Sequence, residues 1–156
     1  MTIEKATKID TEILTSITKK SKAHWGYSDE QISAWSELLT ISSEYVEKNY
    51  VFKLIENDKI IGYYSYYYDS DSILLDNLFI LPEFIGKGFG KILMNDFLSR
   101  VKDSGQKRIL LDSEPNAAQF YSKFGFIKID EIKTSIKDRF LPVMELHLSQ
   151  IKTHQK

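Results

Sequence analysis

The chain has 156 residues and a mass of 18.2 kDa, which is the size of one ordinary domain. With 42% hydrophobic and 28% charged residues it is neither disordered nor fibrous, and its formal net charge of -1 argues against a nucleic acid or an anionic membrane surface as its partner. The sequence has no cysteine, and its three histidines, at positions 24, 147 and 154, are widely separated, so we expect neither a thiol nucleophile nor a metal site.

The first ten residues are polar and include acidic side chains, unlike a signal or transit peptide. No apolar run approaches the roughly 20 residues that cross a bilayer. We therefore expect a cytoplasmic protein without a membrane partner. Residues 1–150 are expected to form a single domain, and residues 151–156 a short polar tail.

Two amphipathic helices are predicted near the N-terminus. Asp10 can cap the first, which should end near Ala23. Its apolar positions at helical spacing are Ile9, Ile13, Leu14 and Ile17. Ser28 and Gln31 form a capping box before the second, shorter helix. Its apolar positions are Ile32, Trp35, Leu38 and Leu39.

Three strands follow in the sequence. Residues 50–55 and a segment from residue 59 onward are predicted to pair as an antiparallel hairpin, with Asn57-Asp58 as its turn. Residues 63–68, which include five tyrosines, are expected to continue this second strand with aromatic side chains on both faces. A third strand is predicted over residues 73–81.

The apolar period then changes to that of a helix. A helix is predicted from Phe89 to a stop at Gly105, followed by a strand over residues 108–111 and a helix over residues 115–124. Residues 126–136 and 141–148 are typical of two closing strands. This order predicts an α/β (α+β) fold, with a mixed, mostly antiparallel central sheet flanked by helices.

A glycine-rich turn at residues 85–91 lies where a strand gives way to a helix. Glycines there allow several backbone N–H groups to converge, and the helix dipole adds positive potential, which suits a phosphate or pyrophosphate. Tight strand-to-helix packing is the alternative explanation. Neither common nucleotide motif fits, because Lys91 replaces the third glycine of a Rossmann fingerprint and Ile92 replaces the Ser/Thr of a Walker A loop.

Two segments resemble motifs of the GNAT superfamily of acyl-CoA-dependent N-acetyltransferases. Residues 78–91, LFILPEFIGKGFGK, are similar to its pyrophosphate-binding motif, and residues 114–126, EPNAAQFYSKFGF, are similar to its second motif. The resemblance implies the GNAT fold, with acetyl-CoA as the acyl donor and CoA as a product. The sequence departs from the family at Ile85, where Gln or Arg is usual, so one polar side chain near the phosphates is lost.

The resemblance also implies which residues contact the cofactor. The strand end at residues 78–80 would lend backbone groups to the pantetheine arm, with one N–H stabilising the charge that develops on the thioester carbonyl. The implied cofactor contacts are Leu78, Phe79, Ile80, Ile85, Gly86, Lys87, Gly88, Phe89, Gly90, Lys91, Asn116 and Tyr121. Alternatively, the apolar side chains belong to the core, the lysines are solvated, and Asn116 serves the start of a helix.

Catalytic roles follow from the same resemblance. Tyr121 matches the tyrosine that protonates the departing CoA thiolate, a task that suits a phenol with a reference pKa near 10. A tyrosine that only packs a short helix is the alternative. Asp76 and Asp112 are the candidate general bases, with Glu114 and His24 as further candidates. Each carboxylate could instead be solvated or cap a helix.

The acceptor is expected to contact a loop and the last hairpin. His24, Trp25 and Tyr27 lie in the loop between the first two helices, and Arg139 lies in the hairpin. These residues would suit an acceptor with an apolar part and an anionic group, although a packed loop is the alternative.

The predicted function is acetyl transfer from acetyl-CoA to a primary amine of a small molecule or peptide. Because the chain has no cysteine, the amine should attack directly, without a covalent enzyme intermediate. A CoA-binding sensor or interaction module that kept the fold and lost turnover is the alternative. The sequence names no acceptor and leaves a homodimer open.

Overall fold

The computed structural model describes residues 1–136 and 138–149, so the expected tail at residues 151–156 lies outside it. The chain divides into two compact units. The first unit contains Met1–Tyr66 and Asn77–Ser99, and the second contains Tyr67–Asp76 and Arg100–Lys156. No helix of the described residues is both long enough and apolar enough to cross a membrane.

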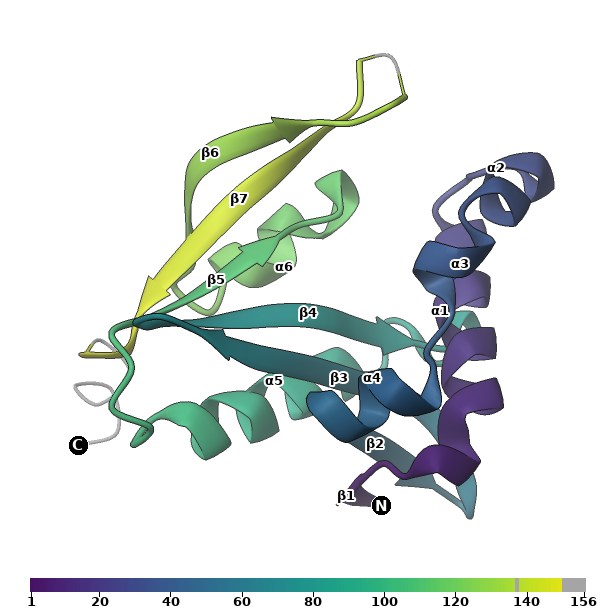
Figure 1. Ribbon diagram of the computed structural model, residues 1–156, viewed down its shortest axis with the longest axis horizontal. Coiled ribbons are helices and arrows are strands. Elements are labelled where there is room, and N and C mark those ends of the chain that lie inside the picture. Colours follow the sequence, from purple (N-terminus) through teal and green to yellow (C-terminus); the bar gives the residue numbers. More distant parts are fainter. Residues whose placement is uncertain (137, 150–156) are drawn as a thin grey trace. The chain divides into compact units, whose positions relative to one another are not determined.

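The strands are β1 (Thr2–Lys5), β2 (Tyr50–Glu56), β3 (Lys59–Asp69), β4 (Ser72–Ile80), β5 (Arg108–Asp112), β6 (Ile127–Lys133) and β7 (Phe140–His147). Their order is β1-β2-β3-β4-β5-β7-β6 (Figure 1). β4 and β5 pair in parallel, whereas β1–β2, β2–β3, β5–β7 and β6–β7 pair antiparallel. The predicted mixed, mostly antiparallel sheet is confirmed.

The α-helices are α1 (Thr11–His24), α2 (Asp29–Ala34), α3 (Ser36–Leu39), α4 (Ser43–Lys48), α5 (Phe89–Val101) and α6 (Ala118–Ser122). Three single-turn 3₁₀ helices are η1 (Lys8–Asp10), η2 (Pro82–Phe84) and η3 (Pro115–Ala117).

The start of α1 differs from the prediction. Asp10 stands at the N-cap, but its carboxylate accepts a hydrogen bond from the Thr7 N–H at 2.8 Å and forms an ion pair with Lys53 on β2, also at 2.8 Å. Ile9 belongs to η1 and is 90% exposed, so the buried stripe of α1 begins at Leu14.

The predicted second helix is broken into α2 and α3 at Trp35. The capping interaction is confirmed, because the Ser28 hydroxyl accepts from the Gln31 N–H at 3.1 Å. Leu38, expected on the apolar face, is 82% exposed because α3 is a single turn that buries only Leu39.

The hairpin of β2 and β3 forms as predicted. Asn57 and Asp58 have φ of 50° and 61°, the left-handed conformation that tight hairpin turns require. In β3, the Tyr63 hydroxyl lies 2.6 Å from that of Thr18 on α1, whereas the Tyr64 hydroxyl donates to Asp96 on α5 at 2.7 Å. The expected strand with aromatic side chains on both faces is therefore confirmed.

Gly62, also in β3, lies where β4 passes very closely. A Cβ at this position would fall 2.7 Å from the Phe79 carbonyl oxygen and 2.6 Å from Ile80 Cδ1. Leu81, just after β4, donates its N–H to the Ile61 carbonyl at 2.8 Å. Glycine thus allows the backbone of the strand end at residues 78–80 to approach β3.

In the second unit, the ladder between β4 and β5 runs from Ser72–Arg108 to Leu74–Leu110, and both strands continue beyond it. β7 lies between β5 and β6 in the strand order. β6 therefore ends that order, and all seven of its residues are exposed. A β-bulge between Lys128 and Asp130 interrupts its pairing with β7.

Candidate functional site

In the first unit, the glycine-rich turn presents open backbone to solvent. Gly86 and Gly88 have φ of 85° and 87°, and a Cβ built on either would meet no atom within 4 Å. The Ile92 N–H donates to the Gly88 carbonyl at 3.2 Å, which is the first hydrogen bond of α5. The backbone N–H groups that precede Ile92 lie at the start of the helix, where a helix offers them no carbonyl partner. This geometry suits an anion.

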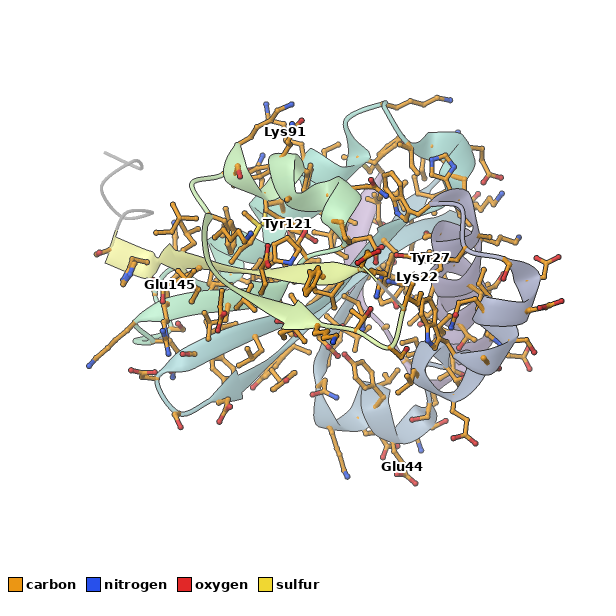
Figure 2. The ribbon with its side chains drawn as sticks, turned by 90° about the horizontal axis from the view of Figure 1, so that it is seen from above. Lys22, Tyr27, Glu44, Lys91, Tyr121 and Glu145 are labelled. Carbon is orange, nitrogen blue, oxygen red and sulfur yellow. The ribbon has the colours of Figure 1, made fainter. Side chains whose placement is uncertain are left out.

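Aromatic and basic side chains flank this turn. The Lys87 ammonium lies 5.5 Å from the centre of the Phe84 ring, and Lys59 lies 5.8 Å from the same ring. Lys91 is exposed (Figure 2). Ile85 is 40% exposed, so a polar side chain at this position would reach solvent.

The end of β4 is only partly available for a ligand. Leu78 and Phe79 are half-buried, and Ile80 is buried. The Ile80 carbonyl already accepts a hydrogen bond from the Ser21 hydroxyl at 3.0 Å. The Lys22 ammonium lies 5.7 Å from the centre of the Phe79 ring.

The predicted acceptor loop follows α1. His24 is exposed and its ring meets that of Trp25 edge-on, with centroids 5.2 Å apart. Tyr27 (labelled in Figure 2) is half-buried. Its ring packs edge-on against that of Trp35, with centroids 5.1 Å apart. The aromatic side chains therefore pack within the loop region while His24 remains accessible.

In the second unit, Tyr121 (labelled in Figure 2) lies on α6. Its ring packs edge-on against Phe126, with centroids 5.9 Å apart. The residue is 9% exposed, and burial, together with the negative charge of Glu114, raises its pKa. No described side-chain oxygen, the Tyr121 hydroxyl included, is both fully buried and without a hydrogen-bond partner.

The two predicted base candidates lie in one electrostatic cluster. Partial desolvation and the charge of Asp76 raise the pKa of Asp112. Desolvation and the charges of Asp76, Asp69 and Asp112 raise the pKa of Tyr67. Tyr67 and Asp69 were missed from the sequence, where their only signal was a position at the end of the tyrosine-rich run.

Two further predicted residues lie near the segment that carries Tyr121. Arg139 forms an ion pair with Glu114 at 3.0 Å, and their side chains are 13% and 10% exposed. Asn116 lies in η3 and is exposed. Within the described residues, no three histidine or carboxylate side chains are arranged to hold a metal ion.

Comparisons with known proteins point to one family. A family model described as an acetyltransferase (GNAT) domain matches residues 24–147. The ribosomal protein bS18-alanine N-acetyltransferase of Haemophilus influenzae is 37% identical over 93 residues, which cover 58% of this chain and 64% of that protein. The uncharacterized N-acetyltransferase ycf52 of Pyropia yezoensis is 30% identical over 73 residues, 46% of this chain and 42% of that protein. The chain thus spans less than two thirds of each relative.

Solved structures show the same fold. PaiA N-acetyltransferase from Thermoplasma acidophilum, in complex with coenzyme A, superposes with a TM-score of 0.77 at 22% identity, covering 94% of this chain and 99% of that one. The ribosomal-protein-S18-alanine N-acetyltransferase from Escherichia coli superposes with a TM-score of 0.71 at 18% identity, covering 94% and 93%.

Proposed function

The chain belongs to the GNAT acetyltransferase family, and from this premise we propose that it transfers an acetyl group from acetyl-CoA to a primary amine of a small molecule or peptide. The observation that carries the proposal is the turn with positive φ at Gly86 and Gly88, which leads into α5 with open space above it. In this fold family that turn is the place for the pyrophosphate.

The residues of the turn fit CoA. The space that a Cβ would occupy at Gly86 or Gly88 is open to a phosphate oxygen, and the start of α5 adds its positive dipole end. Lys87 and Lys91 supply positive charge at the same turn. Backbone groups of residues 78–80 would hold the pantetheine arm. When bound, acetyl-CoA supplies the activated acetyl group.

The proton transfers fall to side chains of the second unit. Tyr121 would donate its phenolic proton to the leaving thiolate, and its raised pKa keeps that proton in place at neutral pH. Asp112 would accept the proton of the acceptor ammonium, directly or through water. Its raised pKa makes it a stronger base than an ordinary carboxylate, while Asp76 adds negative charge that favours a cationic acceptor.

The acceptor class can be identified by testing a panel of amines. Peptides that begin with alanine belong in it because the name of the Haemophilus influenzae relative specifies the alanine of a ribosomal protein. Small amines with an apolar part and a carboxylate belong in it because His24 is exposed beside the aromatic side chains of the loop.

The test is to incubate the protein with acetyl-CoA and the panel and to follow free thiol, with the acetylated product identified by mass spectrometry. We expect acceptor-dependent thiol release that disappears in Gly88→Asp. Tight CoA binding without thiol release on any amine would instead favour a CoA-binding module, an alternative suggested by Ile85. If the protein neither binds CoA nor releases thiol, the proposal is overturned.

A further inference from the structure

The ion pair between Arg139 and Glu114 is a largely buried charged contact of the described residues, next to the segment that carries Tyr121. The Arg139 Nη2 atom lies 3.0 Å from Glu114 Oε2 and 3.3 Å from Oε1, so one guanidinium nitrogen serves both carboxylate oxygens. With side chains 13% and 10% exposed, neither partner is fully solvated. Breaking one half of such a pair leaves a poorly solvated charge.

The backbone ties Glu114 to the helix of Tyr121. Its carbonyl accepts hydrogen bonds from the Ala117 N–H at 2.8 Å and from the Ser113 hydroxyl at 2.7 Å. Glu114 is the N-cap of η3, which runs directly into α6. The backbone of Glu114 is therefore anchored at the start of the turn that leads to Tyr121, and its carboxylate is held by Arg139.

Arg139 is held equally firmly on the other side of the pair. Its carbonyl accepts from the Thr134 N–H at 3.2 Å and from the Thr134 hydroxyl at 2.9 Å, and its own N–H donates to the Ile136 carbonyl at 3.1 Å. These bonds link Arg139 to two residues that follow β6. The Arg139 backbone is thus anchored just before β7, where its guanidinium meets Glu114.

The negative charge of Glu114 also disfavours ionisation of the Tyr121 phenol, in addition to burial, which is the larger cause of its raised pKa. A proton donor whose ionised form is opposed more strongly is a weaker acid. Arg139 compensates the negative charge of Glu114, so it limits this opposition.

We propose that Arg139 is a positioning residue for acetyl transfer, which acts through Glu114 on Tyr121 and does not bind the acceptor amine. This inference rests on the proposed function, in which Tyr121 is the proton donor. It differs from the expectation drawn from the sequence, which placed Arg139 against the acceptor.

The experiment is a double-mutant cycle of Arg139→Met and Glu114→Gln, with Arg139→Lys as the conservative variant. Arg139→Met should lower kcat roughly tenfold, a fraction of a whole general-acid contribution, with the KM for the amine within about twofold of wild type. The double variant should recover kcat to within about threefold, because the uncompensated carboxylate is gone. Arg139→Lys should retain most of the activity.

Two controls separate this role from a structural one. Arg108→Met breaks another ion pair of the second unit, with Glu145 at 2.7 Å, and should lower the melting temperature without a comparable fall in kcat. In the Tyr121→Phe background, Arg139→Met should change kcat by less than about twofold, since the group it acts through is absent.

The inference is overturned if Arg139→Met raises the amine KM at unchanged kcat, or if the double variant is no better than Arg139→Met. A readout independent of turnover is the carbon NMR shift of the hydroxyl-bearing ring carbon of Tyr121, assigned by comparison with Tyr121→Phe. It should move in Arg139→Met and return in the double variant. If this signal does not move, the inference is overturned, even if the protein acetylates none of the amines. The proposed function, in contrast, fails only if the wild-type protein releases no thiol.

Discussion

Tyr121 is a buried residue whose ring packs edge-on against Phe126. Tyr121→Phe preserves the ring and removes the donor, so CoA affinity should survive while kcat and kcat/KM fall together by roughly 10²-fold or more. Steady-state kinetics with CoA calorimetry measures this. The proton is needed only as the thiolate leaves, which is why the KM should change little.

The control for that change is Tyr50→Phe, which removes a hydroxyl from a tyrosine 41% exposed on β2. It should leave turnover as it is. A folded Tyr121→Phe protein with turnover within a few-fold of wild type would falsify the acid role and reduce Tyr121 to a packing residue.

Gly88→Asp should abolish CoA binding. A side chain at φ 87° is strained, and the carboxylate would occupy the open space above the turn and repel phosphate. Gly105→Asp is the matched control, because Gly105 has φ of 85° and equally open surroundings but lies after α5. Calorimetry should show CoA affinity lost in the first variant and retained in the second. Comparable affinities would move the phosphate site elsewhere.

Between elements, the ion pair of Asp10 and Lys53 fastens η1 to β2. Burial alone would raise the pKa of Asp10, but hydrogen bonds from Lys53 and Thr7 outweigh it and lower the pKa. The carboxylate therefore contributes stability above its unfolded pKa of about 3.9, and this contribution is lost as the pH falls through the lower folded value.

Asp10→Asn should accordingly cost about 2 kcal/mol of unfolding free energy at neutral pH, because the charge-assisted bonds are weakened. The difference from wild type should shrink as the pH drops below about 4. Urea unfolding at a series of pH values measures both. A difference that stays constant down to the acid limit would show that Asp10 is not ionised in the folded protein.

The close passage of β4 over β3 makes Gly62→Ala a test of how these strands are arranged. The new methyl group would lie 2.7 Å from the Phe79 carbonyl oxygen, and a backbone atom cannot turn aside as a side chain can. We expect a loss of about 1–3 kcal/mol by denaturant unfolding, with weaker CoA binding because residues 78–80 must shift. Wild-type stability would mean that the strands separate easily at this point.

Long periodic elements were predictable from the sequence, and short ones were not. The hairpin of β2 and β3, the helix α5 and the closing strands match because alternation or helical spacing extends over several residues. The four-residue β1 and six-residue α4 were missed, since too few positions repeat. Ile9 and Leu38 were misplaced because single-turn elements bury only one side of a turn.

For the molecule as a whole, CoA binding should appear as added thermal stability. A ligand that binds only the folded state at a hundred times its dissociation constant adds about 2.7 kcal/mol, or roughly 5–10 °C in melting temperature for a chain of this size. Differential scanning fluorimetry over a CoA series measures this. A melting temperature that does not depend on CoA concentration would argue against a CoA site anywhere in the protein.

The candidate site was predictable where chemistry is local in sequence. The turn at Gly86 and Gly88 follows from glycine spacing, and its open geometry agrees with that expectation. The pairing of Arg139 with Glu114, 25 positions apart, and the grouping of Tyr67 with Asp76 and Asp112 depend on tertiary structure, which no spacing rule encodes. The roles assigned to these residues stay predictions until the variants are measured.

The exposed strand β6 bears on how the protein behaves at high concentration. Its outer edge faces no other strand of the described chain, and Ile127, Ile129 and Ile132 are 59%, 46% and 41% exposed. Such an edge is a template on which a second polypeptide can add and begin aggregation. The bulge beside Lys128 and the Lys128–Glu131 ion pair oppose that growth, because they bend the edge and place charge along it. Lys128 and Glu131, which take no part in any proposed chemistry, are therefore expected to oppose edge-to-edge aggregation of the protein.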